Sequence, residues 1–341
     1  MNFEQRVDNY VAEKLTKHHL AGLSIAVVKQ GVLILSKGYG WANVELKAPA
    51  TAETVYEIAS ITKSFTATAI MMLVEEGRIK LTDPVPLYRT GLRNEWNNIT
   101  IQHLLSHTAG LNYWSVDWFR QDLTADEVCR DVFETPLRFA SGTQFEYNDV
   151  GYNVLGMIIH TVTGKPYEQF LQERVFLPLG MAATQANQWR AIVPNRAAGY
   201  AWENDKLSNS LDIHWHALSN TASDVPANGA NGSLLSTVHD FAKWDAALYG
   251  DALLQPATLR KMWTPNRLID GSVTEYGLGW QVYENAAYHG GRTIVAHSGG
   301  NPGFTTHFGR YPAEQISFAV FINRGDAEPW EIGRDVIGLL R

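Results

Sequence analysis

Cysteine, long apolar runs and excess basic charge are all scarce in this chain of 341 residues. The single cysteine, Cys129, excludes an intrachain disulfide and is expected to be a buried structural thiol. The longest apolar runs, near residues 23–28 and 67–74, are too short to cross a bilayer. Since the formal net charge is −7 and Lys and Arg do not cluster, neither nucleic acid nor a membrane is an expected partner.

Motifs of several common enzyme classes are also missing. There is no Gly-x-Ser-x-Gly, so the nucleophile turn of an ordinary α/β-hydrolase is not expected. There is no His-Glu-x-x-His, no Cys-x-x-Cys and no Walker-type loop, so zinc catalysis and nucleotide binding lack support. His214 and His216 stand close together, but no further histidine or cysteine lies near them in the sequence. We therefore expect no metal and no organic cofactor.

The bulk composition indicates a globular protein with a sizeable core. Hydrophobic residues make up 45% and charged residues 18%, which argues against disorder, and the length suits one large unit or two closely joined domains. Phe3, Val7, Val11 and Leu15 recur every four residues, which predicts an amphipathic first helix and not a signal peptide. We therefore expect a cytoplasmic protein, or an exported one if a leader has been removed.

Strand patterns occur near both ends of the chain, and helical patterns lie between them. Residues 22–43 predict two strands joined by a tight turn. β-Rich segments return from about Tyr276, and a final helix is expected over residues 328–340. We predict an α+β fold with an antiparallel sheet formed from both chain ends and flanked by helices. The sheet domain would comprise residues 1–58 and 235–341, the mainly helical insertion residues 59–234, and the active site would lie at their seam.

Ser60 and Lys63 form the only Ser-x-x-Lys in the chain. Residues three apart lie on the same face of a helix, so the lysine amine can approach the serine hydroxyl. A serine hydroxyl needs a neighbouring base to become a nucleophile, and a lysine kept neutral by burial could be that base. Taken alone, the motif is weak, because Ser60 could equally serve as the N-cap of the helix that follows.

The sequence around these residues resembles the serine β-lactamase and penicillin-binding protein family, in its class C-like branch. That branch includes class C β-lactamases, DD-carboxypeptidases, D-aminopeptidases and family VIII carboxylesterases. The resemblance implies a β-lactamase/transpeptidase-like fold and a serine acyl-hydrolase that forms an acyl-enzyme on Ser60 without a cofactor. The blocks that carry it follow the family's order over nearly the whole chain: Val55–Val85, Ile99–Leu111, Phe145–Thr184, Asn231–Trp244, Tyr276–Trp280 and Ala296–Phe304.

Tyr147 and Asp149 stand where the family has Tyr-x-Asn. The resemblance implies that Tyr147 shares the work of the general base with Lys63. A phenol can do so at neutral pH only if a positive neighbour favours its anion, and Lys63 is the candidate. Asp149 departs from the family's asparagine: an ionised carboxylate can only accept hydrogen bonds, so it would suit a substrate amine or pair with Lys63. A second Tyr-x-Asn, at Tyr283, lies outside the matching block and is interpreted as coincidence.

His297, Ser298 and Gly299 stand where relatives carry Lys-Thr-Gly or His-x-Gly. The resemblance implies an edge strand facing Ser60, with the backbone N–H groups of Ser60 and Gly300 forming the oxyanion hole. His297 could help to bind a substrate carboxylate, more weakly than a lysine would. Without the resemblance, a histidine before Ser-Gly-Gly would be an ordinary residue at a strand end.

Aromatic residues follow the block at Ile99–Leu111, where relatives place a segment beside the substrate cleft. Tyr113 and Trp114 are candidates for its lining, although the spacing of Trp118 and Phe119 after them also suits a packed helix. These two interpretations stay open. His107, within the block, is expected to be a surface, capping or packing residue.

A small-molecule ester or amide is the expected substrate. We favour a carboxylic ester with a small acyl group, because Asp149 replaces asparagine, His297 replaces lysine, and the sequence shows no export signal that a peptidoglycan enzyme would need. The alternative is a β-lactamase, DD-peptidase or D-aminopeptidase, which would use the same machinery on an amide. A third possibility is a binding or scaffold protein that keeps the fold without catalysis.

Overall fold

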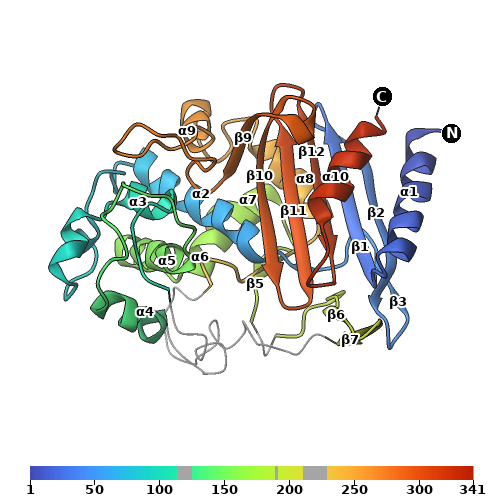
Figure 1. The fold of residues 1–341 in the computed structure, drawn as a ribbon, viewed down its shortest axis with the longest axis horizontal. Helices are drawn as coiled ribbons and strands as arrows, with labels where there is room; N and C mark the ends of the chain where they lie inside the picture. The colour runs from blue at the N-terminus through green and yellow to red at the C-terminus, as the bar shows by residue number, and fades with distance from the viewer. Residues whose placement is uncertain (114–124, 189–190, 210–228, 341) are drawn as a thin grey trace.

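The chain is built around a seven-stranded antiparallel sheet, seen in a computed structural model that describes residues 1–113, 125–188, 191–209 and 229–340. Strands from the start of the chain lie beside strands from its end (Figure 1), in the order β3-β2-β1-β12-β11-β10-β9. The predicted α+β fold with a sheet from both chain ends is therefore confirmed. The strands are β1 (Gly22–Lys29), β2 (Val32–Asn43), β3 (Ala48–Pro49), β9 (Gln281–Ala286), β10 (Arg292–Asn301), β11 (Phe304–Tyr311) and β12 (Ile316–Ile322).

The two chain ends are joined at the centre of the sheet, where β1 pairs with β12 from Leu23↔Ile322 to Lys29↔Ile316. Both strands are almost entirely buried because both faces of the sheet are covered. Alternate residues point to opposite faces. Leu23 and Ile25 belong to one hydrophobic cluster, whereas Ala26 between Ile25 and Val27 belongs to the other.

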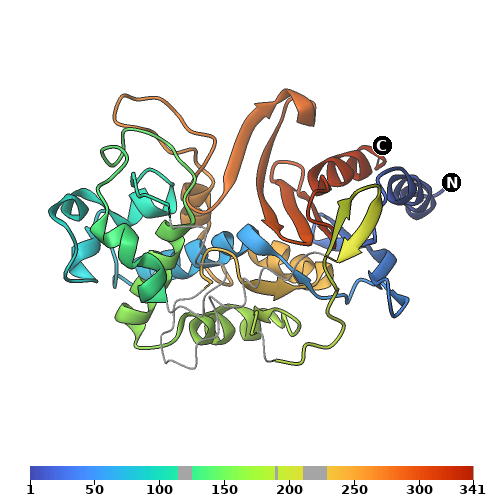
Figure 2. The same cartoon turned by 60° about the horizontal axis from the view of Figure 1, so that its bottom comes forward.

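Two helices from opposite ends of the chain cover one face of the sheet. α1 (Phe3–Lys17) and α10 (Pro329–Gly338) lie side by side there (Figures 1 and 2). α1 begins with a capping box in which Asn2 and Gln5 satisfy each other's backbone N–H groups. Val7 is fully buried, so the predicted amphipathic first helix is confirmed.

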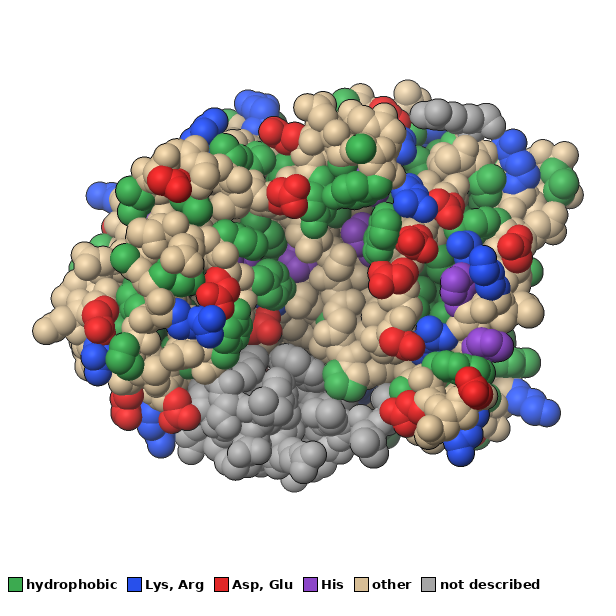
Figure 3. Space-filling model, in the orientation of Figure 1, with side chains coloured by type: hydrophobic (Ala, Val, Ile, Leu, Met, Phe, Trp, Pro, Cys, Tyr) green, Lys and Arg blue, Asp and Glu red, His purple; other side chains and the backbone are tan. Residues whose placement is uncertain are grey.

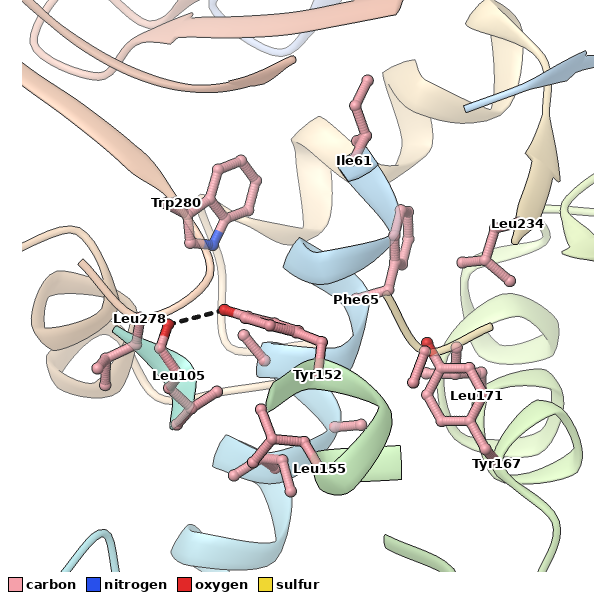
Figure 4. Close-up of a cluster of buried hydrophobic side chains, with 14 of the residues drawn as sticks. Ile61, Phe65, Leu105, Tyr152, Leu155, Tyr167, Leu171, Leu234, Leu278 and Trp280 are labelled. Carbon is pink, nitrogen blue, oxygen red and sulfur yellow. Dashed lines mark hydrogen bonds between the residues drawn. The ribbon is translucent and has the colours of Figure 1, made fainter. Parts of the chain in front are cut away.

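The other face of the sheet packs against α8 and the helical part of the chain. α2 runs through the middle of that part, and every residue from Thr62 to Leu73 is buried. Figure 4 shows Phe65 of α2 in the same buried cluster as Tyr152 and Tyr167. The Tyr152 hydroxyl donates to the Leu105 carbonyl at 2.7 Å. The helices are α2 (Thr62–Glu75), α3 (Ile101–Leu105), α4 (Ala125–Glu134), α5 (Asp149–Thr163), α6 (Tyr167–Leu171), α7 (Leu177–Leu179), α8 (Val238–Ala247) and α9 (Pro256–Met262).

Short strands connect the two parts of the molecule. A three-stranded sheet has the order β4-β8-β5, and β6 pairs with β7 as a separate hairpin. The division into two domains at residues 58 and 235 stays a prediction. Cys129 is buried, as expected. Within the described ranges, no helix is both long enough and apolar enough to cross a membrane. These strands are β4 (Tyr56–Glu57), β5 (Gln185–Ala186), β6 (Tyr200–Glu203), β7 (Lys206–Asn209) and β8 (Leu234–Ser236).

The contact between α10 and the sheet gives a test of the fold. A Cβ on Gly333 would lie 2.0 Å from the buried ring of Phe318, whereas a Cβ on Gly338 of the same helix would meet open space. Gly333→Ala should lower the free energy of unfolding by about 1–3 kcal/mol, because the ring or the helix must move. Urea denaturation followed by circular dichroism measures this effect, with Gly338→Ala as the matched control. Equal stability of the two variants would contradict the described packing.

Candidate active site

Ser60 lies in a tight 3₁₀ turn, Ala59–Ile61, that leads into α2. Ala59 has a φ of 48°, a left-handed conformation that costs a residue with a Cβ about 1–2 kcal/mol. Contacts with the sheet hold the turn in place: the Thr306 hydroxyl of β11 donates to the Ile58 carbonyl at 2.9 Å. Ser60 does not cap α2, whose N-cap residue is Ile61, so the N-cap interpretation is wrong.

Lys63 reaches back to Ser60 from the first turn of α2 and is fully buried. Its Nζ donates to Ser60 Oγ at 3.0 Å and to the Asn231 carbonyl at 2.6 Å, and it lies 2.6 Å from a carboxylate oxygen of Asp149. Two hydrogen-bond acceptors and one carboxylate thus surround the Lys63 nitrogen. Burial lowers the pKa of Lys63, and Asp149 opposes that shift. The ion pair with Asp149 thus favours the ammonium form of Lys63, against the effect of burial.

Tyr147 lies directly before α5, and Asn148 forms the N-cap of that helix. Lys63 Nζ is 4.8 Å from the centre of the Tyr147 ring. The Tyr147 hydroxyl is buried and makes no hydrogen bond of standard geometry, although Ser60 is close enough to favour its anion. Burial first, and Asp149 second, raise the pKa of Tyr147 well above its usual value. Because Lys63 is already paired with Asp149, Tyr147 rests as a neutral phenol.

Asp149 therefore sets the charge balance of the site. Of the two roles considered for it, a pair with Lys63 is the one seen in the structure. Its side chain is 32% exposed, whereas that of Lys63 is fully buried. A carboxylate here stabilises the protonated form of both neighbouring groups, so it raises the pKa of Lys63 as well as that of Tyr147.

β10 passes beside the Ser60 turn. The prediction of an edge strand is wrong, because β9 pairs with β10. That pairing, however, ends at Ala296↔Gln281. The half of β10 from His297 onward lies beyond β9 and lines the cleft with Ser60. A Cβ on Gly299 would lie 2.2 Å from the Ile58 carbonyl oxygen, so only glycine permits this close approach. Gly300, next to it, is exposed and lines the cleft; its part in an oxyanion hole stays a prediction.

His297 is buried, and both of its ring nitrogens have partners. Because a backbone carbonyl can only accept, Nδ1–H donates to the Ser298 carbonyl at 2.7 Å, which leaves Nε2 to accept from the Tyr276 hydroxyl at 2.8 Å. Burial, reinforced by the Lys63 charge, lowers the pKa of His297 to about 3. The ring is thus neutral at ordinary pH, and it offers a substrate carboxylate no charge.

His107 is a site residue to which the sequence assigned no specific role; of the surface, capping and packing positions expected for it, packing is the one seen. It is buried with a φ of 57°, and its Nδ1 accepts the Asn148 N–H at 3.0 Å. Its ring lies 4.2 Å from that of Tyr147, centre to centre. Burial lowers its pKa well below the usual value, with Lys63 and His297 adding to the effect. His107 is thus a neutral positioning residue for Tyr147. In the sequence, only the place of His107 within the block Ile99–Leu111 indicated a role in the site.

The cleft beside Ser60 has a volume of about 580 Å³. Figure 3 shows a hollow near the middle of one face, with histidine side chains at its base and acidic side chains on its rim. The only charged side chains that line the cleft in the described part of the chain are those of Glu275 and Glu328. Wall residues without a role assigned from the sequence include Phe145, Tyr276, Gln281, Tyr283 and Trp330.

Tyr113 borders the site, and Trp114 lies outside the described residues. The Tyr113 side chain is 47% exposed, and its hydroxyl donates to the Tyr147 carbonyl at 3.1 Å. It therefore supports the segment that carries Tyr147 and does not belong to the core. The His214–His216 segment is also outside the described residues. Among those described, no group of three or more His, Cys, Asp or Glu side chains is placed to hold a metal ion.

Comparisons with known proteins agree with this geometry. The family model described as Beta-lactamase matches residues 7–340. Penicillin-binding protein 4* of Bacillus subtilis is 28% identical over 335 residues, which cover 94% of this chain and 72% of that protein. The octameric penicillin-binding protein homologue of Pyrococcus abyssi has a TM-score of 0.82 at 29% identity, over 98% of this chain and 77% of that one. D-amino acid amidase of Ochrobactrum anthropi, solved with L-phenylalanine amide, has a TM-score of 0.82 at 25% identity, over 100% and 99% of the two chains. This chain therefore belongs to the serine β-lactamase and penicillin-binding-protein-like family of hydrolases.

Proposed function

We propose that the protein is a carboxylesterase that hydrolyses uncharged esters with a small acyl group through an acyl-enzyme on Ser60. The observation that carries the proposal is the charge of the cleft: Glu275 and Glu328 line it, His297 is neutral, and no Lys or Arg lines it in the described part of the chain. A substrate carboxylate, which penicillins and cephalosporins carry, would lose its hydration there without gaining a cationic partner. An uncharged ester meets no such penalty.

The chemistry begins with attack of Ser60 Oγ on the ester carbonyl carbon. The Ser60 proton passes to the pair formed by Lys63 and Tyr147, once that pair has lost one proton to solvent. This loss leaves either a lysine amine or a tyrosine phenolate, and both forms have the same total charge. The pair then gives a proton to the leaving alcohol. Water repeats the sequence on the acyl-enzyme and releases the acid.

The developing negative oxygen needs donors that are already in position. The backbone N–H groups of Ser60 and Gly300 are the proposed pair, since Ser60 opens the 3₁₀ turn and Gly300 lies on the half of β10 that passes it. The close approach that Gly299 permits sets the spacing between the turn and the strand. In comparable sites one such donor supplies about 3–4 kcal/mol of transition-state stabilisation.

Hydrolysis of D-amino acid amides is the second candidate. It is favoured by the acidic lining of the cleft, because Glu275 or Glu328 could bind a substrate ammonium. The similar D-amino acid amidase structure, at 25% identity over the full chain, supports it independently. The same Ser60 acyl-enzyme would form, with ammonia in place of an alcohol as the leaving group.

Rates on three substrates test this assignment. We expect kcat/KM for 4-nitrophenyl butyrate to exceed that for a chromogenic cephalosporin by at least about a hundredfold, which corresponds to about 2.7 kcal/mol of discrimination. D-Phenylalanine amide, followed by ammonia release, should be slower than the ester. Ser60→Ala should abolish turnover of all three while circular dichroism shows an unchanged fold. Faster turnover of the cephalosporin, or full ester turnover by Ser60→Ala, would overturn the proposal.

The pH profile of ester hydrolysis tests the role of Asp149. Its charge raises the pKa of Lys63 and of Tyr147, so removing it lowers the pKa at which their pair releases a proton. The acid limb of kcat/KM should therefore move to lower pH in Asp149→Asn, by roughly one unit or more. Glu146→Gln is the control, because Glu146 pairs with Arg138 at 3.1 Å and makes no ion pair with Lys63. An unmoved limb in Asp149→Asn would show that the carboxylate is not coupled to the base.

A further inference from the structure

A second cavity of about 380 Å³ adjoins the catalytic cleft. Gln281, Tyr283, Ser298 and Trp330 line both spaces, so the two lie next to each other and share part of their walls. We call the second space the side chamber; the rest of its wall consists of Tyr288, His289 and His307. The mechanism on Ser60 uses none of these last three residues.

Aromatic side chains from three different segments form most of the chamber wall. Tyr283 lies on β9, Tyr288 and His289 follow in a 3₁₀ turn, and Trp330 lies at the start of α10. The Tyr288 ring meets those of Tyr283 and Trp330 edge to face, each with 6.1 Å between centroids. The Trp330 indole N–H donates to Glu328 at 2.9 Å, which fixes the indole plane. Tyr288 nevertheless remains 51% exposed, so the aromatic wall stays open to a ligand.

The chamber is uncharged. Burial lowers the pKa of His307 to about 3, and burial together with Arg292 and Arg334 lowers that of His289 to about 4. The Arg334 guanidinium already lies 5.0 Å over the Trp330 ring. No Asp or Glu lines the chamber in the described part of the chain, so a substrate ammonium would find no counter-charge in its wall. Arg292 and Arg334 lie outside the chamber wall. Each is paired with a carboxylate, Arg292 with Glu314 and Arg334 with Asp335, so they do not favour an anion in the chamber either.

Ser298 connects the chamber to the reaction centre. Its hydroxyl lies 2.9 Å from His307 Nδ1, which holds its side chain in place. Along an extended strand two residues span about 7 Å, so Ser298 in the chamber wall is that far from Gly300 at the proposed oxyanion site. A substituent attached within a few bonds of the reacting carbonyl can therefore reach the chamber.

We propose that the side chamber is a substrate subsite that binds an uncharged aromatic ring, or a bulky apolar group of similar size, attached to the ester that reacts at Ser60. The proposal deepens the proposed function and rests on it. Flat rings suit this wall because edge and face contacts with tyrosine and tryptophan add to the burial of apolar surface. A cavity of this volume accommodates a two-ring group.

Two ester pairs without a chromogenic leaving group test the subsite. The first pair differs in the alcohol and compares methyl butanoate with 2-naphthylmethyl butanoate. The second pair differs in the acyl group and compares methyl butanoate with methyl 2-naphthylacetate. Acid release in a pH-stat gives kcat/KM for each. We expect a preference of roughly tenfold or more for the naphthyl member in one pair, which identifies the side of the ester that enters the chamber. Tyr288→Ala should reduce that preference by about three- to tenfold.

Trp41→Ala is the matched control, because Trp41 is a similarly exposed aromatic residue on β2, at the opposite side of the sheet. It should keep the full naphthyl preference. No naphthyl preference in either pair, or a preference that survives in Tyr288→Ala, would overturn the subsite.

A binding experiment separates failure of the subsite from failure of the proposed function. If the wild-type protein hydrolyses none of the esters, the esterase proposal fails, and the chamber is then tested by titrating 2-naphthol into Ser60→Ala with ligand-observed NMR. Binding that weakens at least threefold when Tyr288→Ala is added supports the chamber as an aromatic site. Binding that is absent, or equal with and without Tyr288→Ala, refutes it.

Discussion

The site depends on one buried ammonium. Lys63 lies in a fully buried position and reaches an anion, a backbone carbonyl and the Ser60 hydroxyl at the same time. An isolated charge at this depth would be strongly disfavoured, so the pair with Asp149 is what permits it. The contact orients the serine oxygen, and it also fixes the protonation states of its neighbours. The pKa of Tyr147 is raised by its burial first and by the carboxylate that stabilises Lys63 second, so Tyr147 is neutral.

The second constraint is the close packing of β10 and β11 on the turn that carries Ser60. Gly299 has no side chain because the Ile58 carbonyl occupies that space, and Thr306 binds the same carbonyl. Ala59 keeps its left-handed conformation within these contacts. The turn comes early in the chain, before the helical region, whereas β10 and β11 come from the end of the chain. The nucleophile and its proposed oxyanion donors therefore meet only in the complete fold. This explains why Ser60 lies where α2 meets the sheet.

The sequence was sufficient to predict the parts of this account that depend on local pattern and on the family resemblance. Alternating strands at both ends predicted the sheet, and the helical spacing of Ser60 and Lys63 predicted their contact. The sequence alone could not show the charge states of the site residues, because these depend on burial and on partners distant in the chain. The neutrality of His297 follows from its burial and from the charge of Lys63, which is 234 positions earlier in the chain. The pairing of Asp149 was one of two open alternatives for the same reason.

Contacts between distant segments account for the residues that the sequence analysis missed or misjudged. His107 was expected to be a surface, capping or packing residue, and its contact with the Asn148 N–H shows a specific role in holding Tyr147. Tyr283 seemed coincidental as part of a second Tyr-x-Asn, yet β9 places it in the wall shared by the cleft and the side chamber. Trp330 joins the same wall from the start of α10.

Covalent labelling of the purified protein tests the central claim most directly, namely that Lys63 makes the Ser60 hydroxyl reactive. After incubation with a fluorophosphonate at neutral pH, peptide mass spectrometry should find one adduct, on Ser60. In Lys63→Met, which keeps the length of the side chain but has no amine, the adduct should form at least about a hundredfold more slowly. An adduct on another residue, no adduct at all, or an unchanged labelling rate in Lys63→Met would contradict the account.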